Sequence, residues 1–128
     1  MNKTQEFPPA DQRNQVNNSV SVNHDNVFGL KFILNTGEAK NFTSLPITIG
    51  RGDQNDIVIN DETISAVHAR VYFDELIREV CILDNDSLNG ILVNECPTYR
   101  NVLQDGVQLR LGRVSITFRD TGYIHSVS

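Results

Sequence analysis

The feature that most restricts the fold of this chain is an alternation of apolar and polar residues near its C-terminal end. It occupies residues 107–111 (VQLRL) and returns in residues 114–118 (VSITF), with Gly112-Arg113 between them. Successive side chains of a β-strand point to opposite faces of a sheet, so a period of two predicts strands with one buried side. We expect the two segments to form a hairpin closed by a tight turn at Gly112-Arg113.

Earlier parts of the chain also have the composition of short strands, and turn signals such as Asn35-Thr36-Gly37 separate them. Many short strands at regular spacing are typical of a β-sandwich. The sequence therefore predicts an all-β domain. The further strands are expected at residues 27–34, 38–45, 46–50, 57–59, 69–73, 79–84 and 90–94.

One segment is compatible with two structures. Ile64, Val67 and Val71 follow one another at helical spacing, and Asp61 has the side chain of a helix cap. Periodicity alone predicts a helix or a loop followed by a strand equally well. Because the rest of the chain has the pattern of β structure, we expect the loop and strand.

The two ends of the chain differ from its middle. Residues 1–26 are rich in Asn, Gln, Ser and Asp and contain few apolar side chains. Such a segment cannot bury enough apolar surface to offset its ordering entropy, so we expect a disordered polar tail. The folded domain is predicted at residues 27–120, and a short C-terminal tail at residues 121–128.

Charge and composition exclude several classes of function. The chain has 128 residues and a net charge of -5, which argues against nucleic acid or an anionic membrane as a partner. Cys81 and Cys96 fit no metal-binding spacing and are too few for a disulfide framework. We therefore expect both cysteines to act as small apolar residues, and we expect no metal and no cofactor. No segment approaches the roughly 20 apolar residues of a membrane helix, and the first residues lack the apolar stretch of a signal peptide, so we expect neither. We expect a cytoplasmic protein.

Three short motifs that lie beside predicted strands carry the potential chemistry. Gly50-Arg51 ends one strand, residues 65–68 (SAVH) precede another, and residues 86–90 (DSLNG) precede a third. Residues 55–57 (NDI) lie between the first and second of these motifs, and a strand that ends in Asn94 follows the third. This ordered set resembles the forkhead-associated (FHA) family over roughly residues 27–120. The resemblance implies a β-sandwich of two antiparallel sheets, about eleven short strands, with binding loops at one end.

The resemblance implies that Arg51 and Ser65 contact a phosphate group and that the backbone of Ala66 adds to the site. An Arg side chain presents a planar fork of donors that matches phosphate oxygens, and it stays charged at physiological pH. A Ser hydroxyl supplies one more donor, and loop N–H groups can form an anion-binding concavity. Some family members carry Asn or Lys after the Ser, so Ala66 removes one phosphate contact.

A second set of residues is implied to contact the peptide around the phosphothreonine. Asn89 is expected to hydrogen-bond the peptide backbone, with Leu88 and Thr63 beside it. Leu88 replaces a hydroxyl residue of some members, and it can contact the threonine methyl group. Thr63 occupies the position at which some family members that bind acidic motifs carry Arg. We therefore do not expect a preference for Asp three residues after the phosphothreonine. Structural roles are implied for Gly50, His68, Gly90 and Asn94.

We therefore expect a phosphothreonine-binding module of a Ser/Thr kinase pathway, without enzymatic activity and monomeric. One alternative is a phospho-independent scaffold domain on the same fold. A second alternative is a hydrolase that uses Ser65 and His68, although no strand–nucleophile–helix elbow surrounds Ser65. A calcium loop at residues 84–95 is rejected because Leu88 occupies a ligand position and the turn glycine arrives one residue late.

The N-terminal tail offers one further hypothesis. Thr4 lies in the sequence KTQEF, and a kinase that phosphorylated it would create a ligand within the same chain. About twenty residues of linker would suffice for Thr4 to reach Arg51 at random-coil dimensions. A passive tail is the simpler expectation, and we favour it.

Overall fold

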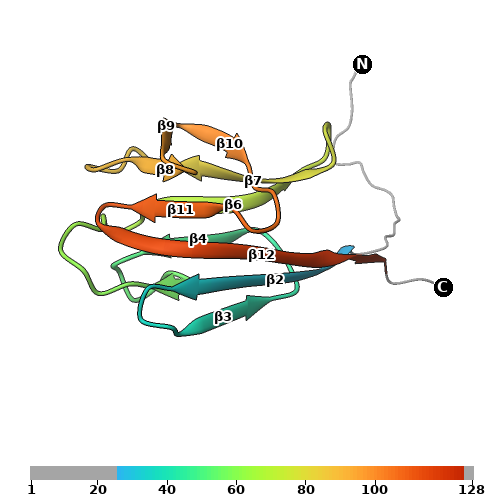
Figure 1. The fold of residues 1–128 in the computed structure, drawn as a ribbon, viewed down its shortest axis with the longest axis horizontal. Helices are drawn as coiled ribbons and strands as arrows, with labels where there is room; N and C mark the ends of the chain where they lie inside the picture. Colours follow the sequence, from blue (N-terminus) through green and yellow to red (C-terminus); the bar gives the residue numbers. More distant parts are fainter. Residues whose placement is uncertain (1–25, 126–128) are drawn as a thin grey trace, which may run out of the picture. The chain divides into compact units, whose positions relative to one another are not determined.

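The computed structural model describes the backbone of residues 26–125 and the side chains as far as residue 122. The tail predicted at residues 1–26, with Thr4, lies outside the described residues except for Asn26. The described chain forms eleven β-strands and no helix (Figure 1). None of it therefore forms a helix that could cross a membrane. The strands are β2 (Asn26–Leu34), β3 (Ala39–Phe42), β4 (Ile47–Gly50), β5 (Ile57–Val58), β6 (Ala69–Asp74), β7 (Glu79–Asp84), β8 (Ile91–Val93), β9 (Cys96–Thr98), β10 (Arg100–Val102), β11 (Gln108–Leu111) and β12 (Val114–His125).

The strands form two sheets, which confirms the predicted all-β sandwich. One sheet has the order β10-β7-β6-β4-β5 and the other the order β3-β2-β12-β11-β8-β9. Within the first sheet the neighbouring strands are antiparallel except for β4 and β5, which run parallel, so this one of the two predicted antiparallel sheets contains a parallel pair. The reason is the loop at residues 51–56, which carries the chain back before β5 begins.

Apolar side chains from both sheets form a single core. Phe28 of β2 and Phe73 of β6 meet across the sandwich with ring centroids 5.4 Å apart. Within the second sheet, Phe32 packs against Phe118 of β12 at 5.2 Å. Aromatic pairs at these distances contribute beyond the apolar area that they bury. The core is completed by the alternating inward residues that the strand patterns predicted.

The closing hairpin forms as its alternation predicted. Leu111 of β11 pairs with Val114 of β12, with the two-residue turn between them. The ambiguous segment is a loop followed by β6, and Ile64 of that loop is buried in the core. Of the three residues at helical spacing, Ile64 thus anchors the loop, whereas Val71 is a buried residue of β6.

Two features of the fold differ from the predictions. Strand β12 continues to His125, so the domain boundary expected after residue 120 falls inside a strand. Its extension is paired with β2, where the hydroxyl of Thr121 donates to the carbonyl of Gly29 at 3.0 Å. Strands β9 and β10 were not placed by the sequence. They are short, largely exposed and lack an alternating pattern.

Candidate functional site

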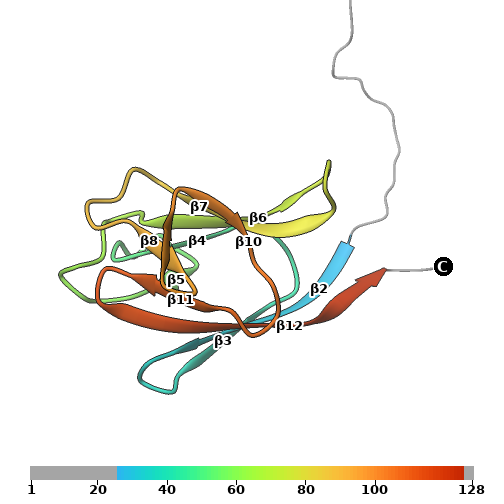
Figure 2. The ribbon, with the colours of Figure 1, turned by 45° about the horizontal axis from the view of Figure 1, so that its top comes forward.

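The three motifs meet at one end of the sandwich. The β4–β5 loop, the β5–β6 loop, the β7–β8 loop and the β11–β12 turn all lie at the left end in Figure 1, and Figure 2 shows them at the same end after rotation. The buried polar side chains of the described residues also lie in or beside these loops. They are Asn55, His68 and Asp84.

Backbone hydrogen bonds join the Arg51 loop to the Ser65 loop. The N–H of Arg51 donates to the carbonyl of Ser65 at 3.0 Å, and the N–H of Gly52 donates to the carbonyl of Ala66 at 3.0 Å. The two loops are therefore held side by side without the use of the side chains of Arg51, Ser65 or Ala66. This arrangement leaves those side chains available for a ligand.

Asn55 lies between the same two loops. Its Nδ2 donates to the carbonyl of Gly52 at 2.8 Å and to that of Ala66 at 2.7 Å. The residue is only 7% exposed, and its Oδ1 is the one buried side-chain nitrogen or oxygen atom of the described residues that has no hydrogen-bond partner. Two carbonyl acceptors fix the orientation of the amide, since its oxygen cannot take the place of the donor. Asn55 belongs to the motif at residues 55–57, but the sequence alone indicates no role for it.

The closeness of the loops depends on a glycine at position 50. A Cβ at Gly50 would lie 2.3 Å from the carbonyl oxygen of Ala66 and 2.8 Å from Nδ2 of Asn55. The first of these is a backbone atom that cannot move without the loop. Gly50 thus allows a close approach that any other residue would prevent.

We expect Gly50→Ala to lower the free energy of unfolding by about 2 kcal/mol or more, because overpacking against backbone forces a shift of the loop. Chemical denaturation measures the effect. Gly52→Ala is the matched control. Its Cβ would come within 3.0 Å only of the flexible end of Gln54, at 2.8 Å, and would lie 3.2 Å from the Ala66 oxygen. Equal loss of stability in both variants would contradict the close-approach role of Gly50.

Arg51 differs from most arginines of the described chain in lacking a carboxylate partner. Arg70 shares this property, whereas the remaining arginines of residues 26–125 form ion pairs. Arg51 is exposed and lines an open depression of about 360 Å³ together with Gly52, Asp53, Asn60 and Ala66. An exposed guanidinium whose charge no carboxylate compensates is suited to binding an anion.

The hydroxyl of Ser65 faces the β7–β8 loop. Its Oγ accepts a hydrogen bond from the N–H of Leu88 at 3.0 Å. The hydroxyl hydrogen is not used in that bond, so Ser65 can still donate to a ligand oxygen. Leu88 itself is 88% exposed. Ser65 and Leu88, which are 23 residues apart in the sequence, are thus brought into direct contact.

His68 is fully buried and connects the β5–β6 loop to the β7–β8 loop. Its Nδ1 accepts the N–H of Ser65 at 3.0 Å, and its Nε2 lies 2.8 Å from the carbonyl oxygen of Gly90. A backbone N–H can only donate and a carbonyl can only accept, so the ring is the neutral tautomer with its hydrogen on Nε2. Both nitrogens are engaged by backbone groups, and neither bonds the Ser65 hydroxyl. This geometry does not support the hydrolase hypothesis, in which His68 would act as the base.

A side-chain network shapes the β7–β8 loop that carries Leu88 and Asn89. The carboxylate of Asp84 accepts the hydroxyl of Ser87 at 2.5 Å and its N–H at 3.2 Å. Ser87 Oγ in turn accepts the N–H of Gly90 at 2.8 Å. Gly90 has φ 75°, which suits a glycine. Asp84 is buried within this network, and no cluster of metal-ligating side chains occurs among the described residues.

Asn94 lies farther along the chain, in the β8–β9 turn. Its N–H donates to the carbonyl of Gln108 at 2.7 Å, and its Oδ1 accepts the N–H of Gln108 at 2.9 Å. Asn94 also has φ 50°, a conformation that Asn tolerates. It therefore ties the β8–β9 turn to β11 and does not join the loops around Arg51.

The remaining predicted residues, Thr63 and Asn89, are joined to each other. The Nδ2 of Asn89 donates to the carbonyl of Thr63 at 2.8 Å. Thr63 is also bonded to Asp61, whose carboxylate accepts its N–H at 2.8 Å and its hydroxyl at 2.6 Å. Asp61 further accepts Nε of Arg113 at 3.0 Å. The sequence alone did not indicate that Asp61 and Arg113 belong to the site.

These bonds lower the pKa of Asp61 from 3.8 to about 2, chiefly through the Thr63 hydroxyl, then the Thr63 N–H and the Arg113 guanidinium. A carboxyl group whose folded pKa is depressed stabilises the fold above its unfolded pKa, and this stabilisation is lost as the pH falls through the folded pKa. We therefore expect stability to decline between about pH 4 and pH 2, and Asp61→Asn to reduce that slope. Denaturant unfolding at a series of pH values measures both slopes. Identical slopes would contradict the prediction.

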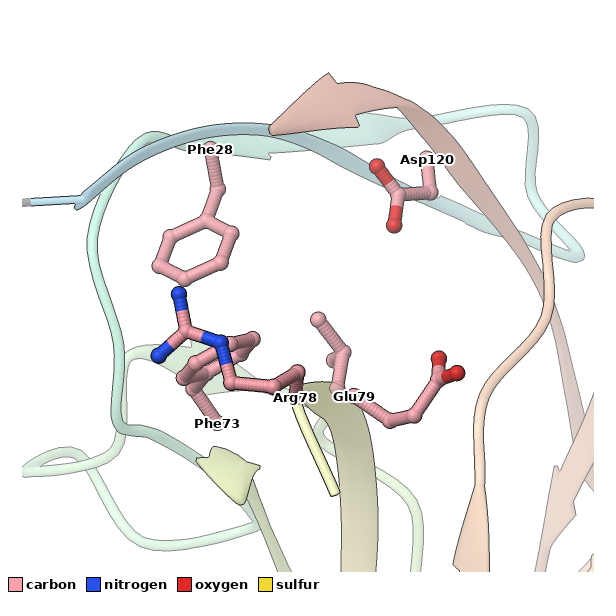
Figure 3. Close-up of a pocket in the computed structure, with 6 residues that line it drawn as sticks. Phe28, Phe73, Arg78, Glu79 and Asp120 are labelled. Carbon is pink, nitrogen blue, oxygen red and sulfur yellow. The ribbon is translucent and has the colours of Figure 1, made fainter. Parts of the chain in front are cut away.

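A separate pocket of about 210 Å³ lies at the opposite end of the sandwich. Figure 3 shows Arg78 and the two rings of Phe28 and Phe73 on one side of it and the carboxylates of Glu79 and Asp120 on the other. The guanidinium of Arg78 lies 5.1 Å from the centre of the Phe73 ring. None of the sequence motifs contributes to this pocket, so the candidate site is the cluster of loops around Arg51.

Comparison with known proteins agrees with the fold and the motifs. The family model of the FHA domain matches residues 47–112, slightly more than half of the chain. The chain is 37% identical over 71 residues to an oxoglutarate dehydrogenase inhibitor of Corynebacterium efficiens, covering 56% of this chain and 49% of that protein. It is 33% identical over 69 residues to the glycogen accumulation regulator GarA of Mycobacterium tuberculosis, covering 54% and 41%. The chain thus spans less than half the length of either relative.

A solved structure from work on phosphothreonine-dependent FHA domain interactions has the same fold. Its TM-score is 0.65 at 27% sequence identity, and the superposition covers 71% of this chain and 95% of the other. The matched residues 47–112 include every loop of the candidate site up to the first residue of the β11–β12 turn. The chain therefore belongs to the FHA domain family.

Proposed function

We propose that this domain binds phosphothreonine in a partner protein and so works in Ser/Thr kinase signalling. The single observation that carries the proposal is the exposed Arg51, which has no carboxylate partner among the described residues and whose N–H is bonded to the carbonyl of Ser65, a residue with an unused hydroxyl hydrogen. The phosphate would accept hydrogen bonds from both side chains, with the exposed loop at Ala66 beside them. Asn89 and Leu88 would contact the peptide.

The energetics favour a switch that depends on phosphorylation. A phosphorylated threonine carries about -1.5 to -2 charge near neutral pH, and hydrogen bonds to charged groups contribute roughly 1.5–3 kcal/mol each. Two such bonds correspond to a hundredfold or greater difference in affinity. Because the whole chain has a net charge of -5, its long-range field opposes an anionic ligand, and the local contacts must supply the attraction.

The names of the relatives support a regulatory role. They include an inhibitor and a regulator, and the solved structure was studied for phosphothreonine-dependent interactions. We propose by this analogy that the domain is a binding module without catalytic activity. We also propose that it acts as a monomer in the cytoplasm, without nucleic acid or membrane as a partner.

Titration calorimetry with matched peptides tests the proposal. Three peptides of one sequence, with phosphothreonine, phosphoserine or plain threonine, are titrated into the full chain. We expect binding of the phosphothreonine peptide and at least about a hundredfold weaker binding of the plain peptide. Equal binding of phosphorylated and plain peptides would overturn the proposal and favour the phospho-independent scaffold.

A further inference from the structure

Asn89, the residue assigned to the peptide backbone, has its side chain fixed before any ligand binds. Its Nδ2 donates to the carbonyl of Thr63 at 2.8 Å, and a carbonyl can accept only from the nitrogen of the amide. This bond settles which end of the carboxamide faces Thr63. The Oδ1 of Asn89 then points away from Thr63, on an exposed residue, as an acceptor available to a ligand.

Thr63 in turn is held through its backbone N–H and its side-chain hydroxyl. Its N–H and its hydroxyl both donate to Oδ1 of Asp61, at 2.8 and 2.6 Å. Its Oγ1 accepts the N–H of Arg113 at 3.0 Å. The carbonyl that receives Asn89 therefore belongs to a residue with little freedom to move.

The β11–β12 turn closes this network from a distant part of the sequence. Nε of Arg113 donates to Oδ2 of Asp61 at 3.0 Å across a separation of 52 residues. Gly112 has φ 57°, and a Cβ there would lie 2.4 Å from Oγ1 of Thr63. The turn is thus pressed directly against Thr63, and only glycine allows the approach.

The charge of Arg113 is already compensated, so this arginine is not a second phosphate ligand. Besides its bond to Asp61, its guanidinium lies 3.7 Å from a carboxylate oxygen of Glu62. Arg51, in contrast, has no carboxylate partner among the described residues. The two arginines therefore have different roles, and that of Arg113 is exerted through Thr63.

We propose that Asp61, Thr63 and Arg113 are positioning residues that fix the carboxamide of Asn89, so that its Oδ1 accepts a backbone N–H of the bound peptide. The proposal rests on the proposed function, since it names how that same site recognises the peptide. It assigns Thr63 to the support of Asn89 where the resemblance suggested a peptide contact. It also makes the last hairpin of the domain a part of the recognition apparatus.

Substitutions in the network test the positioning role. We expect Thr63→Val and Arg113→Ala to weaken binding of the phosphothreonine peptide about three- to tenfold, the equivalent of one hydrogen bond. Thr63→Ser keeps the hydroxyl and should bind within about twofold of the unchanged chain. Arg110→Ala is the matched control, because Arg110 forms a similar exposed ion pair with Glu95 at 2.8 Å, and that pair does not involve Asp61, Thr63 or Asn89.

Nuclear magnetic resonance measures a local property that a general loss of stability would not change. In the free protein, the side-chain NH₂ signals of Asn89 should shift in Thr63→Val and Arg113→Ala but not in Thr63→Ser or Arg110→Ala. Unchanged Asn89 signals together with unchanged affinity in the first pair would overturn the inference.

A change in the peptide tests the same point in the unchanged protein. Replacing single amides around the phosphothreonine by esters removes one N–H at a time. One ester should weaken binding about three- to tenfold, and the same ester should have no further effect on Asn89→Ala. If the phosphothreonine peptide is selected but no ester weakens binding, the inference fails and the proposed function stands. If phosphorylated and plain peptides bind alike, the proposed function itself fails.

Discussion

Arg51→Ala should abolish the preference for phosphorylated peptide. The guanidinium can form two charge-assisted hydrogen bonds to phosphate at roughly 1.5–3 kcal/mol each, so we expect a loss of affinity of about a hundredfold or more. Arg51→Lys keeps the charge but not the planar fork, and should recover only part of the affinity. Titration calorimetry with phosphorylated and plain peptides measures the ratio.

The folded structure should be unaffected by the change at Arg51. Only its backbone N–H takes part in the hydrogen bond to Ser65, and alanine retains that group. Arg70→Ala is the matched control, because Arg70 is also exposed and has no carboxylate partner among the described residues, but lies on β6. A phosphopeptide affinity that survives Arg51→Ala, or that falls equally in Arg70→Ala, would rule out Arg51 as the phosphate ligand.

His68→Ala should cause the largest loss of stability among changes at the site. It removes the partners of the Ser65 N–H and the Gly90 carbonyl and leaves a cavity where a fully buried ring had been. Each unsatisfied buried group costs about 1–3 kcal/mol, so we expect the free energy of unfolding to fall by about 3–6 kcal/mol. Denaturant unfolding monitored by circular dichroism measures this fall.

The variants His68→Asn and His68→Gln test the two hydrogen bonds of His68 one at a time. The amide oxygen of Asn can replace Nδ1 as the acceptor for Ser65, whereas the amide nitrogen of Gln can replace Nε2 as the donor to Gly90. We expect both variants to be more stable than His68→Ala and His68→Asn to retain more phosphopeptide binding, because it supports the Ser65 loop directly. A loss below about 1 kcal/mol in His68→Ala would refute the bracing role.

The strands were predictable wherever burial on one face imposed a strict pattern. The hairpin of β11 and β12 follows from its period of two, and its register follows from the two-residue turn. Strands β9 and β10 lacked such a pattern because most of their side chains are exposed. The end of β12 was missed because pairing with β2, and not local alternation, extends it past residue 120.

The site was predictable only as far as its motifs are local. Arg51, Ser65 and Asn89 were named from short motifs, and the fold brings all three to one end of the sandwich. Their assignment to phosphate and peptide remains a prediction. The pair of Asp61 and Arg113 was missed because its members are 52 residues apart, and nothing in either segment alone indicates the other. Asn55 was quoted as a motif residue, but its bonds to two carbonyls depend on the close approach of separate loops.

In the two joined loops, the groups that hold the site in shape differ from the side chains that are exposed to a ligand. Backbone groups and Asn55 hold the loops together, while the exposed side chains of Arg51, Ala66 and Leu88 take no part in that support. Exchanges at Ala66 or Leu88 can therefore alter the preferred peptide at little cost to folding. Under the proposed function, descendants of one sequence can acquire new phosphorylated partners while they keep the same melting temperature. The domain would then also be a practical starting point for engineered phosphopeptide reagents.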